Sequence, residues 1–296
     1  MAKYTWSETF LSIEGEGLYA GHSTIYARFS LCNFKCKGFN NPEKLDTTAI
    51  NVLGFDPKDY SDIYSIPLIT RGCDSIYSWD PKFAHMWKTG DENDVIDELF
   101  KILPNNSFIL PSGKRVIWSI TGGEPTLRAK FLPTLFHHPR MADCNHILIE
   151  TNCAVPLKGD FIDEISKWLQ VDPSRRWTWS NSPKLSVSGE AWDEAIVPSV
   201  ALMQQTLKDR HPTQVDQYFK FVCGPDDSDF DEVARAMSEY HSAGISKDVD
   251  IYVMPVACQE SDQKAIAAAV AMQCIHRGYI HCHRIHLEIF GNAPGT

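Results

Sequence analysis

Two patterns of hydrophobic residues alternate along the chain. Short runs rich in β-branched and aromatic residues predict strands at Ser23–Leu31, Arg115–Ile120, His146–Glu150, Gln217–Val222, Asp250–Met254 and Arg284–Phe290. Apolar residues at helical spacing predict helices at Glu92–Leu103, Asp160–Leu169, Ser228–Ala243 and Gln259–Arg277. Alternation of this kind favours parallel strands joined by crossover helices. We therefore expect an α/β fold, with about six strands in an open or partial barrel rather than a closed eight-stranded one.

One stretch breaks this alternation. Residues 37–72 are rich in Asn, Asp, Pro and Tyr and show only weak periodicity. Loops of that length inside compact domains are usually functional or disordered. We expect a single domain over residues 1–296, in which Lys37–Gly72 forms an insertion loop or a small subdomain.

Charge and cysteine content narrow the class of protein. The formal net charge is -10, whereas indiscriminate nucleic-acid binders usually carry an excess of Lys and Arg, so we expect no direct nucleic-acid partner. No apolar run reaches the length of a membrane helix, and the first residues lack the apolar core of a secretory signal. We therefore expect a cytoplasmic protein without a membrane partner. The nine cysteines favour thiolate chemistry or buried free thiols over a disulfide framework.

Two of the cysteines, Cys32 and Cys36, follow the first predicted strand directly. Iron–sulfur clusters are held by Cys thiolates, often closely spaced in the sequence, but two cysteines cannot hold a four-iron cluster alone. In the Cys-x3-Cys-x2-Cys spacing usual for radical S-adenosylmethionine enzymes, the third position would be Phe39, which cannot be a ligand. Two structural thiols beside a strand explain the pair equally well, since free Cys is often buried.

A third cysteine, Cys73, changes this balance. If Lys37–Gly72 is removed, Cys32-x3-Cys36 joins Cys73-Asp74-Ser75-Ile76-Tyr77-Ser78-Trp79-Asp80. The joined sequence resembles the 7-carboxy-7-deazaguanine synthases, a radical S-adenosylmethionine family with a Cys-Asp-Thr tripeptide followed by a Tyr-x-Trp-Asp-like run. The resemblance implies a [4Fe-4S] cluster held by Cys32, Cys36 and Cys73, with the insertion delaying the third ligand by 36 residues.

Zinc is the competing metal hypothesis. Zinc takes four ligands, commonly paired cysteines with further Cys or His at short spacing, and His22 or His85 could be recruited. Neither histidine forms a recognisable zinc pair, so the iron–sulfur interpretation is favoured. The remaining cysteines are interpreted as buried thiols: Cys144, Cys153, Cys223, Cys258, Cys274 and Cys282.

The string Thr121-Gly122-Gly123-Glu124-Pro125 comes directly after a predicted strand. Two glycines let a ligand approach the backbone closely, and Glu124 offers a carboxylate to an ammonium group. Gly-Gly alone would indicate only a turn. The full string is similar to the motif by which radical S-adenosylmethionine enzymes bind the methionine amino group. The resemblance implies that Gly122, Gly123 and Glu124 bind the cofactor and that Thr121 contacts substrate.

Three further strand ends are similar to segments of the same family. The resemblance implies that Glu150, in Glu150-Thr151-Asn152, meets ribose hydroxyls, and that Asp74 also binds the cofactor. It places Ser182, Pro183 and Lys184 at the methionine end, and Met254 and Pro255 near the adenine. Each segment alone is weak, because Pro after a strand usually means only a turn; together, in the family's order, they point to one cofactor site.

Substrate-binding residues are implied in the same way. Ile13-Glu14-Gly15-Glu16-Gly17 resembles a Gln-Gly-Glu-Gly hairpin that contacts the pterin, with Glu14 in place of Gln; without the resemblance it is a solvated turn. Arg28 could bind a substrate carboxylate bidentately, or could be a surface residue on an edge strand. Ser75 stands where the family has a Mg²⁺-binding Thr. His286, in the last predicted strand, and the terminal Thr296 also resemble substrate contacts, although lone histidines in strands are more often structural.

The resemblance covers Glu8 to Asn292 apart from the insertion. It implies a partial (β/α)6-type barrel that uses a [4Fe-4S] cluster, S-adenosyl-L-methionine and Mg²⁺. The implied reaction contracts 6-carboxy-5,6,7,8-tetrahydropterin to 7-carboxy-7-deazaguanine with loss of ammonia, in queuosine-type biosynthesis. The implied partners are an electron donor such as flavodoxin or ferredoxin and a second copy in a homodimer.

Two alternatives stay open. One is a radical activase that abstracts hydrogen from a partner protein's glycine, which should lack the Glu14–Gly17 hairpin and Arg28. The other is a degenerate, non-catalytic relative whose cluster the insertion has destroyed. A zinc-dependent hydrolase would not explain the cofactor-like strand ends.

Overall fold

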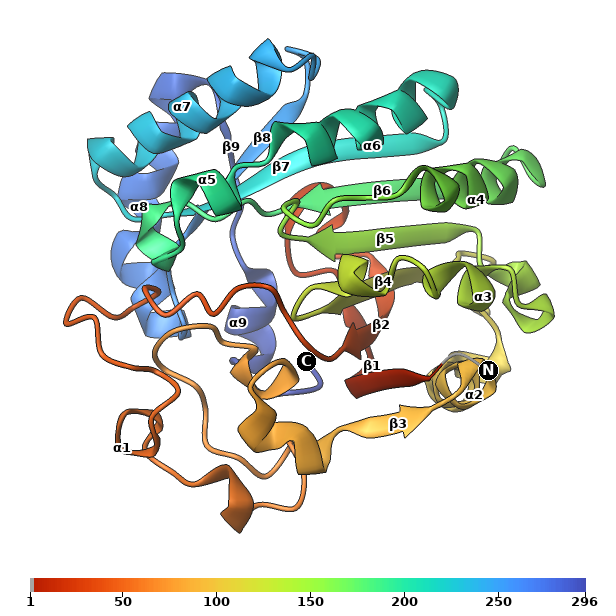
Figure 1. Ribbon diagram of the computed structural model, residues 1–296, viewed down its shortest axis with the longest axis horizontal. Coiled ribbons are helices and arrows are strands. Elements are labelled where there is room, and N and C mark those ends of the chain that lie inside the picture. The colour runs from red at the N-terminus through yellow and green to blue at the C-terminus, as the bar shows by residue number, and fades with distance from the viewer. Residues whose placement is uncertain (1–2) are drawn as a thin grey trace.

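Over residues 3–296, which the computed structural model describes, nine strands form one sheet in the order β3-β1-β2-β4-β5-β6-β7-β8-β9 (Figure 1). Its centre consists of six neighbouring parallel strands in chain order: β2 (Ser23–Phe29), β4 (Ile117–Gly122), β5 (His146–Thr151), β6 (Arg176–Asn181), β7 (Val215–Cys223) and β8 (Asp250–Pro255). β1 (Tyr4–Ile13) and β3 (Lys88–Gly90) extend one edge antiparallel, and β9 (Ile280–His281) extends the other. The expected α/β class with an open arrangement of six parallel strands is confirmed.

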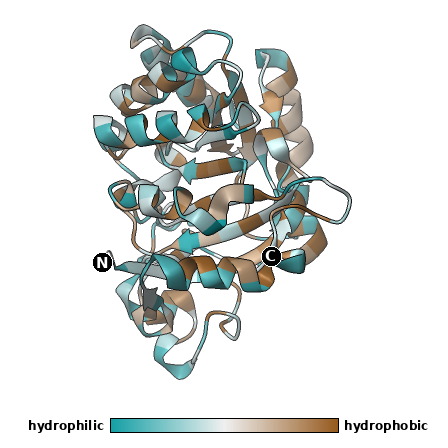
Figure 2. Cartoon of the chain, turned by 90° about the vertical axis from the view of Figure 1, so that its right-hand side faces the viewer, coloured by the Kyte–Doolittle hydropathy of each residue, from teal (hydrophilic) through white to brown (hydrophobic). Residues whose placement is uncertain are grey.

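Crossover helices connect the parallel strands. The helices are α1 (Ile50–Leu53), α2 (Glu92–Ile102), α3 (Leu132–Phe136), α4 (Gly159–Gln170), α5 (Trp192–Ala195), α6 (Pro198–Arg210), α7 (Asp227–Ser242), α8 (Glu260–Arg277) and α9 (Ile285–Phe290). α2 illustrates the local rules: Asp91 caps its first turn in a capping box with Asp94, and its apolar stripe is buried. Figure 2 shows hydrophobic strands between helices whose outer turns are hydrophilic.

Aromatic residues fill the space between the sheet and its helices. The ring of Trp177 on β6 lies edge-on to Phe136 of α3 at 5.5 Å, to Trp168 of α4 at 6.1 Å and to Trp179 at 5.5 Å. Edge-to-face packing of this kind stabilises beyond simple burial, by about 0.5–1.5 kcal/mol per pair. The core therefore lies on the helix-covered face, and the carboxyl ends of the strands are left free to form a site.

The predicted helices match α2, α4, α7 and α8 closely. One predicted strand, Arg284–Phe290, is wrong: these residues contain the helix α9. Ile285, Leu287 and Ile289 alternate as in a strand, and a run this short fits either period, so packing decides its structure. No range was predicted for four of the strands and four of the helices: β1, β3, β6, β9, α1, α3, α5 and α6. In α6 the buried Gln204 and Gln205 interrupt the apolar stripe.

Residues 37–72 form an irregular segment at the carboxyl ends of the strands, drawn in orange in Figure 1. The segment has a small hydrophobic cluster of its own, in which Phe55, Ile63, Ile66 and Ile69 pack with residues that follow Cys73. Asn40 also donates a hydrogen bond to the Thr70 carbonyl, and the Gly72 N–H donates to the Phe39 carbonyl at 2.8 Å. The two ends of the segment are thus hydrogen-bonded to each other, which brings Cys73 close to the residues that follow Cys36.

In the part of the chain that the structure describes, no helix combines the length and the apolar character needed to cross a membrane.

Candidate active site

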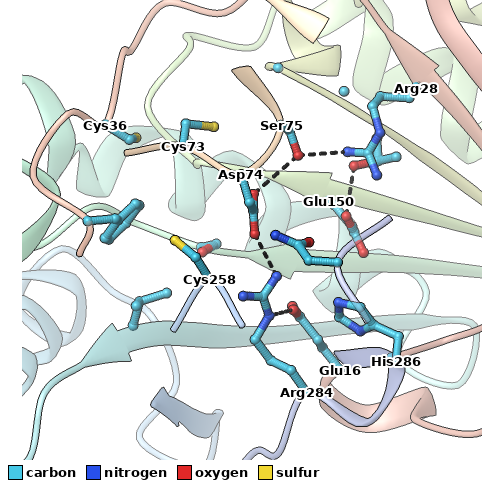
Figure 3. Close-up of a pocket in the computed structure, with 18 of the residues that line it drawn as sticks. Glu16, Arg28, Cys36, Cys73, Asp74, Ser75, Glu150, Cys258, Arg284 and His286 are labelled. Carbon is cyan, nitrogen blue, oxygen red and sulfur yellow. Dashed lines mark hydrogen bonds and ion pairs between the residues drawn. The ribbon is translucent and has the colours of Figure 1, made fainter. Parts of the chain in front are cut away.

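A cavity opens at the carboxyl ends of the parallel strands, between the β1–β2 hairpin, the segment around Cys73 and the C-terminal residues (Figure 3). Ligands of α/β sheets gather at this end. Most of the residues that the sequence analysis expected at a site line this cavity: Ile13, Glu14, Gly15, Glu16, Arg28, Cys32, Cys36, Cys73, Asp74, Ser75, Thr121, Gly122, Gly123, Glu150, Ser182, Lys184, Met254, Pro255, His286 and Thr296. Glu124 and Pro183 lie outside the lining.

The three cysteines share one side of the cavity. Cys32 and Cys36 follow β2, and Cys73 lies against the same hydrophobic cluster as Cys36 although 36 residues separate their segments. Burial raises the pKa of Cys32 to about 12 and that of Cys73 to about 11, so both thiols are protonated until a cation replaces the protons. Among residues 3–296, no three His, Cys, Asp or Glu side chains are close enough to enclose a single metal ion. A four-iron cluster needs wider spacing, because each thiolate binds a different iron.

The two glycines of the Thr-Gly-Gly-Glu-Pro string hold strand β4 against the start of the cysteine loop. A Cβ on Gly122 would lie 2.0 Å from the Phe29 carbonyl oxygen, and one on Gly123 would lie 2.3 Å from that of Leu31. Gly122 also has φ +152, which disfavours other residues. The glycines are therefore required by the close approach of two chain segments, a reason that the sequence did not reveal.

Glu124 does not face the cavity as expected. Its Oε1 accepts hydrogen bonds from the Thr126 N–H at 2.9 Å and from the hydroxyls of Thr126 and Thr151, and its Oε2 accepts from the Asn152 N–H at 2.7 Å. The side chain is 1% exposed. In this arrangement the carboxylate ties the ends of β4 and β5 together.

Other strand ends contribute polar groups directly to the cavity. Glu150, at the end of β5, accepts a hydrogen bond from the Thr121 hydroxyl at 2.7 Å. Lys184 extends from the loop after β6 and donates to the Ser182 hydroxyl at 3.1 Å. Met254 and Pro255 form an apolar section where β8 ends. Charged groups and an apolar surface are thus arranged around the same space.

Arg28 lies in the interior of the sheet, since β2 pairs with both β1 and β4. The hypothesis of a surface residue on an edge strand is wrong. Its Nε donates to Glu8 Oε1 at 2.6 Å, and its Nη1 donates to the Ser75 hydroxyl at 3.2 Å. Tyr77 donates to the same Glu8 oxygen at 2.9 Å. Glu8, which sequence analysis missed, therefore holds Nε, while Ser75 accepts from Nη1 and Arg28 lines the cavity.

Arg284, also missed, joins three parts of the site. Its Nη2 donates to Asp74 Oδ2 at 2.7 Å, its Nε donates to Glu16 Oε1 at 2.8 Å, and its Nη1 donates to the Ala257 carbonyl (Figure 3). Burial disfavours the Asp74 carboxylate, but the charge of Arg284 outweighs burial and lowers its pKa. Lys220 of β7 forms a second ion pair with Glu16. This network orients the hairpin and the Cys73 segment relative to each other.

Three carboxylates, those of Glu14, Glu16 and Glu150, share the cavity near Lys220. The pKa of Glu16 is lowered, because Lys220 and Arg284 outweigh the effect of burial. Burial and the charge of Glu150 instead raise the pKa of Glu14 well above its usual value, so Glu14 holds a proton more readily than an exposed carboxyl does. A protonated Glu resembles Gln, the residue that the related hairpin carries at this position.

Glu14→Gln is therefore expected to stabilise the protein increasingly as pH rises. Unfolded Glu loses its proton near about pH 4.3, whereas folded Glu14 keeps it to higher pH; between those values the folded state binds more protons and wild-type stability falls with pH. Because Gln does not titrate, the variant does not lose stability in this way. The free energy of unfolding of both proteins is measured by urea unfolding at about pH 5, 7 and 8. A variant that is less stable than wild type by a constant amount at every pH would contradict this assignment.

The C-terminal residues close one side of the cavity. His286 lies on α9, not on a strand, and a Cβ on Gly15 would lie 1.9 Å from its Nδ1, so Gly15 leaves room for this ring. Burial lowers the pKa of His286 to about 4, so the ring is neutral near pH 7. Thr296 reaches the cavity wall, and Gly295 lies beside the ring of Tyr64 from the insertion. The buried Cys258 also lines the cavity, next to the Gly72 carbonyl.

Comparisons with known proteins identify relatives of the whole chain. No protein-family profile matches the chain. It is 26% identical over 292 residues to a 7-carboxy-7-deazaguanine synthase of Rhodopirellula baltica, covering 98% of this chain and 88% of that protein. It is 25% identical over 296 residues to a 7-carboxy-7-deazaguanine synthase of Halobacterium salinarum, covering 98% and 91%.

A solved structure shares the fold. The crystal structure of QueE from Escherichia coli matches with a TM-score of 0.52 at 14% identity, over 95% of this chain and 93% of that one. The arrangement of strands and helices is therefore that of a known enzyme fold. The two sequence relatives confirm the expected resemblance to the 7-carboxy-7-deazaguanine synthases, and the structural match confirms the fold.

Proposed function

We propose that the protein is a radical S-adenosylmethionine enzyme that converts 6-carboxy-5,6,7,8-tetrahydropterin to 7-carboxy-7-deazaguanine with release of ammonia. The observation that carries the proposal is the convergence of Cys32, Cys36 and Cys73 on one cavity that also contains Arg28 and the Glu14–Glu16 hairpin. A radical activase would have no need of this hairpin and arginine. The three cavity-lining thiols also weigh against a degenerate binder.

The residues fit a four-iron cluster and its cofactor. Three thiols leave one of the four irons without a protein ligand. The Gly122–Gly123 backbone and Lys184 line the same cavity and could bind the amino-acid end of S-adenosylmethionine. When bound, the cluster and S-adenosylmethionine supply a 5′-deoxyadenosyl radical that abstracts hydrogen from the substrate. Met254 and Pro255 offer an apolar surface to the adenine, and Glu150 offers an acceptor to a ribose hydroxyl. The chain's own contribution is to bind, orient and exclude water.

The polar half of the cavity suits a carboxylated pterin. The N–H groups of Arg28 that do not donate to Glu8 or Ser75 can receive the substrate carboxylate, while Glu14 and Glu16 can accept hydrogen bonds from the amino and ring N–H groups of the substrate. Thr121 and the neutral imidazole of His286 add further polar contacts, and Thr296 lies near enough to join them. Ser75 and Asp74 together would offer Mg²⁺ a hydroxyl and a carboxylate beside that substrate carboxylate.

Arg28→Lys is expected to raise the KM for the pterin by about 10-fold or more with a smaller effect on folding. Lys keeps the positive charge that Glu8 requires but cannot form a two-pronged contact, and a hydrogen bond between charged groups contributes about 1.5–3 kcal/mol. Steady-state kinetics together with thermal unfolding separate the two effects. An unchanged KM in a well-folded variant would remove Arg28 from substrate binding.

The direct test of the proposal is substrate-triggered cleavage of S-adenosylmethionine. Anaerobically reconstituted protein with reductant is expected to form 5′-deoxyadenosine much faster when the pterin is added than with a tetrahydropterin that lacks the carboxyl group. Cleavage that needs a partner protein instead of the pterin would favour the activase.

We further propose a cytoplasmic homodimer that accepts electrons from a flavodoxin or a ferredoxin.

A further inference from the structure

The loop after β6 holds the cluster-binding segment in place. Glu190 Oε1 accepts hydrogen bonds from two consecutive backbone N–H groups, those of Lys35 at 2.9 Å and of Cys36 at 2.6 Å. The Ser188 carbonyl accepts a third from the Gly38 N–H at 2.8 Å. A Cβ on Gly38 would lie 2.4 Å from the Val187 carbonyl oxygen, so the two segments are in direct backbone contact. The loop and the segment form one clamp, for which Glu190 supplies the side chain.

The clamp supports an unfavourable backbone conformation. Cys36 has φ +47, in the left-handed region, which costs a residue other than glycine about 1–2 kcal/mol. Such a conformation persists only where neighbouring groups hold it. The bond from the Cys36 N–H to Glu190 is one such constraint, and it sets the direction in which the thiol projects into the cavity (Figure 3).

The same contact brings a negative charge to the second cysteine. Within the described residues no Lys or Arg forms an ion pair with Glu190, so its carboxylate is satisfied by the two N–H groups and by solvent. The reduction potential of an iron–sulfur cluster depends on the net charge around it and on N–H bonds to its sulfurs. A nearby carboxylate disfavours the addition of an electron to the cluster by its charge. It also occupies two N–H donors that could otherwise bond to the cluster sulfurs.

We propose that Glu190 is a positioning residue for the cluster: it holds Cys36 in its ligating conformation and lowers the reduction potential of the bound cluster. The inference rests on the proposed function, since it requires that Cys32, Cys36 and Cys73 bind a cluster. A low potential serves that function, because the cluster must donate an electron to a sulfonium, which is difficult to reduce.

Two substitutions separate the two roles. Glu190→Gln keeps an oxygen that can accept from both N–H groups but removes the charge, so cluster content stays at the wild-type level while the midpoint potential shifts to a more positive value. Glu190→Ala removes the contact, so iron content falls well below wild type. Glu194→Gln is the matched control, because Glu194 lies exposed on the neighbouring α5 and loses the same charge. The potential is measured by EPR-monitored redox titration.

Amide hydrogen exchange in the cluster-free protein tests the clamp without any cluster. Exchange of the Lys35 and Cys36 amides should be faster in Glu190→Ala than in wild type, and unchanged in Glu194→Gln. Equal exchange in all three proteins, or an unchanged midpoint potential in Glu190→Gln, would overturn the corresponding part of the proposal. A wild-type protein that binds no cluster would overturn the proposed function and the effect on potential, while the exchange result would still decide the clamp.

Discussion

Cys73→Ala is expected to bind no stable four-iron cluster and to lose all turnover above background. The structure brings this thiol to the wall that Cys32 and Cys36 share, and two remaining thiolates cannot complete a three-cysteine site. The loss should be specific: a buried Cys→Ala change alone costs only about 1 kcal/mol of folding free energy. Iron and sulfide content, the optical spectrum and the EPR signal after anaerobic reconstitution measure the effect.

The controls for this experiment come from two buried cysteines. Cys274→Ala removes a buried thiol on α8, outside the cavity lining, and should reconstitute as wild type does. Cys258→Ala removes the fourth thiol that lines the cavity and should also retain the cluster. If Cys258→Ala lost the cluster and Cys73→Ala kept it, the alignment across residues 37–72 would be wrong and Cys258 would be the third ligand.

Arg284→Met is expected to destabilise the protein by about 3–5 kcal/mol and to lower kcat/KM by about 10- to 100-fold. The Arg284 side chain is 12% exposed and pairs with two carboxylates, so its loss leaves Asp74 without its ion pair and Glu16 with Lys220 alone. Asp74 would then no longer be held beside Ser75, where Mg²⁺ is proposed to bind. Urea unfolding and steady-state kinetics at varied Mg²⁺ measure both effects.

The matched control is Arg277→Met, which removes an arginine of the same length from ion pairs with the exposed Asp227 and Asp231. Such surface pairs contribute about 0–1 kcal/mol, so stability and kinetics should stay close to wild type. A double-mutant cycle with Asp74→Asn should give a coupling energy of about 1–3 kcal/mol. Additive effects of Arg284→Met and Asp74→Asn would mean that the ion pair has no role in placing Asp74.

The sequence predicted the parallel sheet because its buried strands are continuous apolar runs that end in turn residues. It failed where polar groups are buried inside an element. In β1 the apolar Tyr4, Trp6 and Phe10 alternate with polar residues, but the buried Glu8 interrupts that alternation and a bulge follows Trp6, so the strand and the role of Glu8 stayed hidden. α6 contains Gln204, which accepts hydrogen bonds from Asn181 and Gln217 inside the protein.

Site residues that belong to a sequence motif could be predicted. Residues that only hold a motif residue in place could not. Cys73 could be found because the residues after it continue the pattern begun at Cys36. Arg284 and Glu190 carry no motif, since each acts through partners far away in the chain. Glu124 belongs to a clear motif, and the motif predicted that its carboxylate binds the cofactor. In the structure the carboxylate instead accepts hydrogen bonds from Thr126, Thr151 and Asn152.

The proposed function requires that one cavity hold both a cluster whose ligands are split across an insertion and a carboxypterin. The most direct test is to incubate anaerobically reconstituted wild-type protein with reductant, S-adenosylmethionine, Mg²⁺ and 6-carboxy-5,6,7,8-tetrahydropterin, and to identify the products by mass spectrometry. We expect 7-carboxy-7-deazaguanine, formed only when the cluster and S-adenosylmethionine are both present. A cluster-loaded protein that cleaves S-adenosylmethionine but leaves the pterin unchanged would contradict the proposed function.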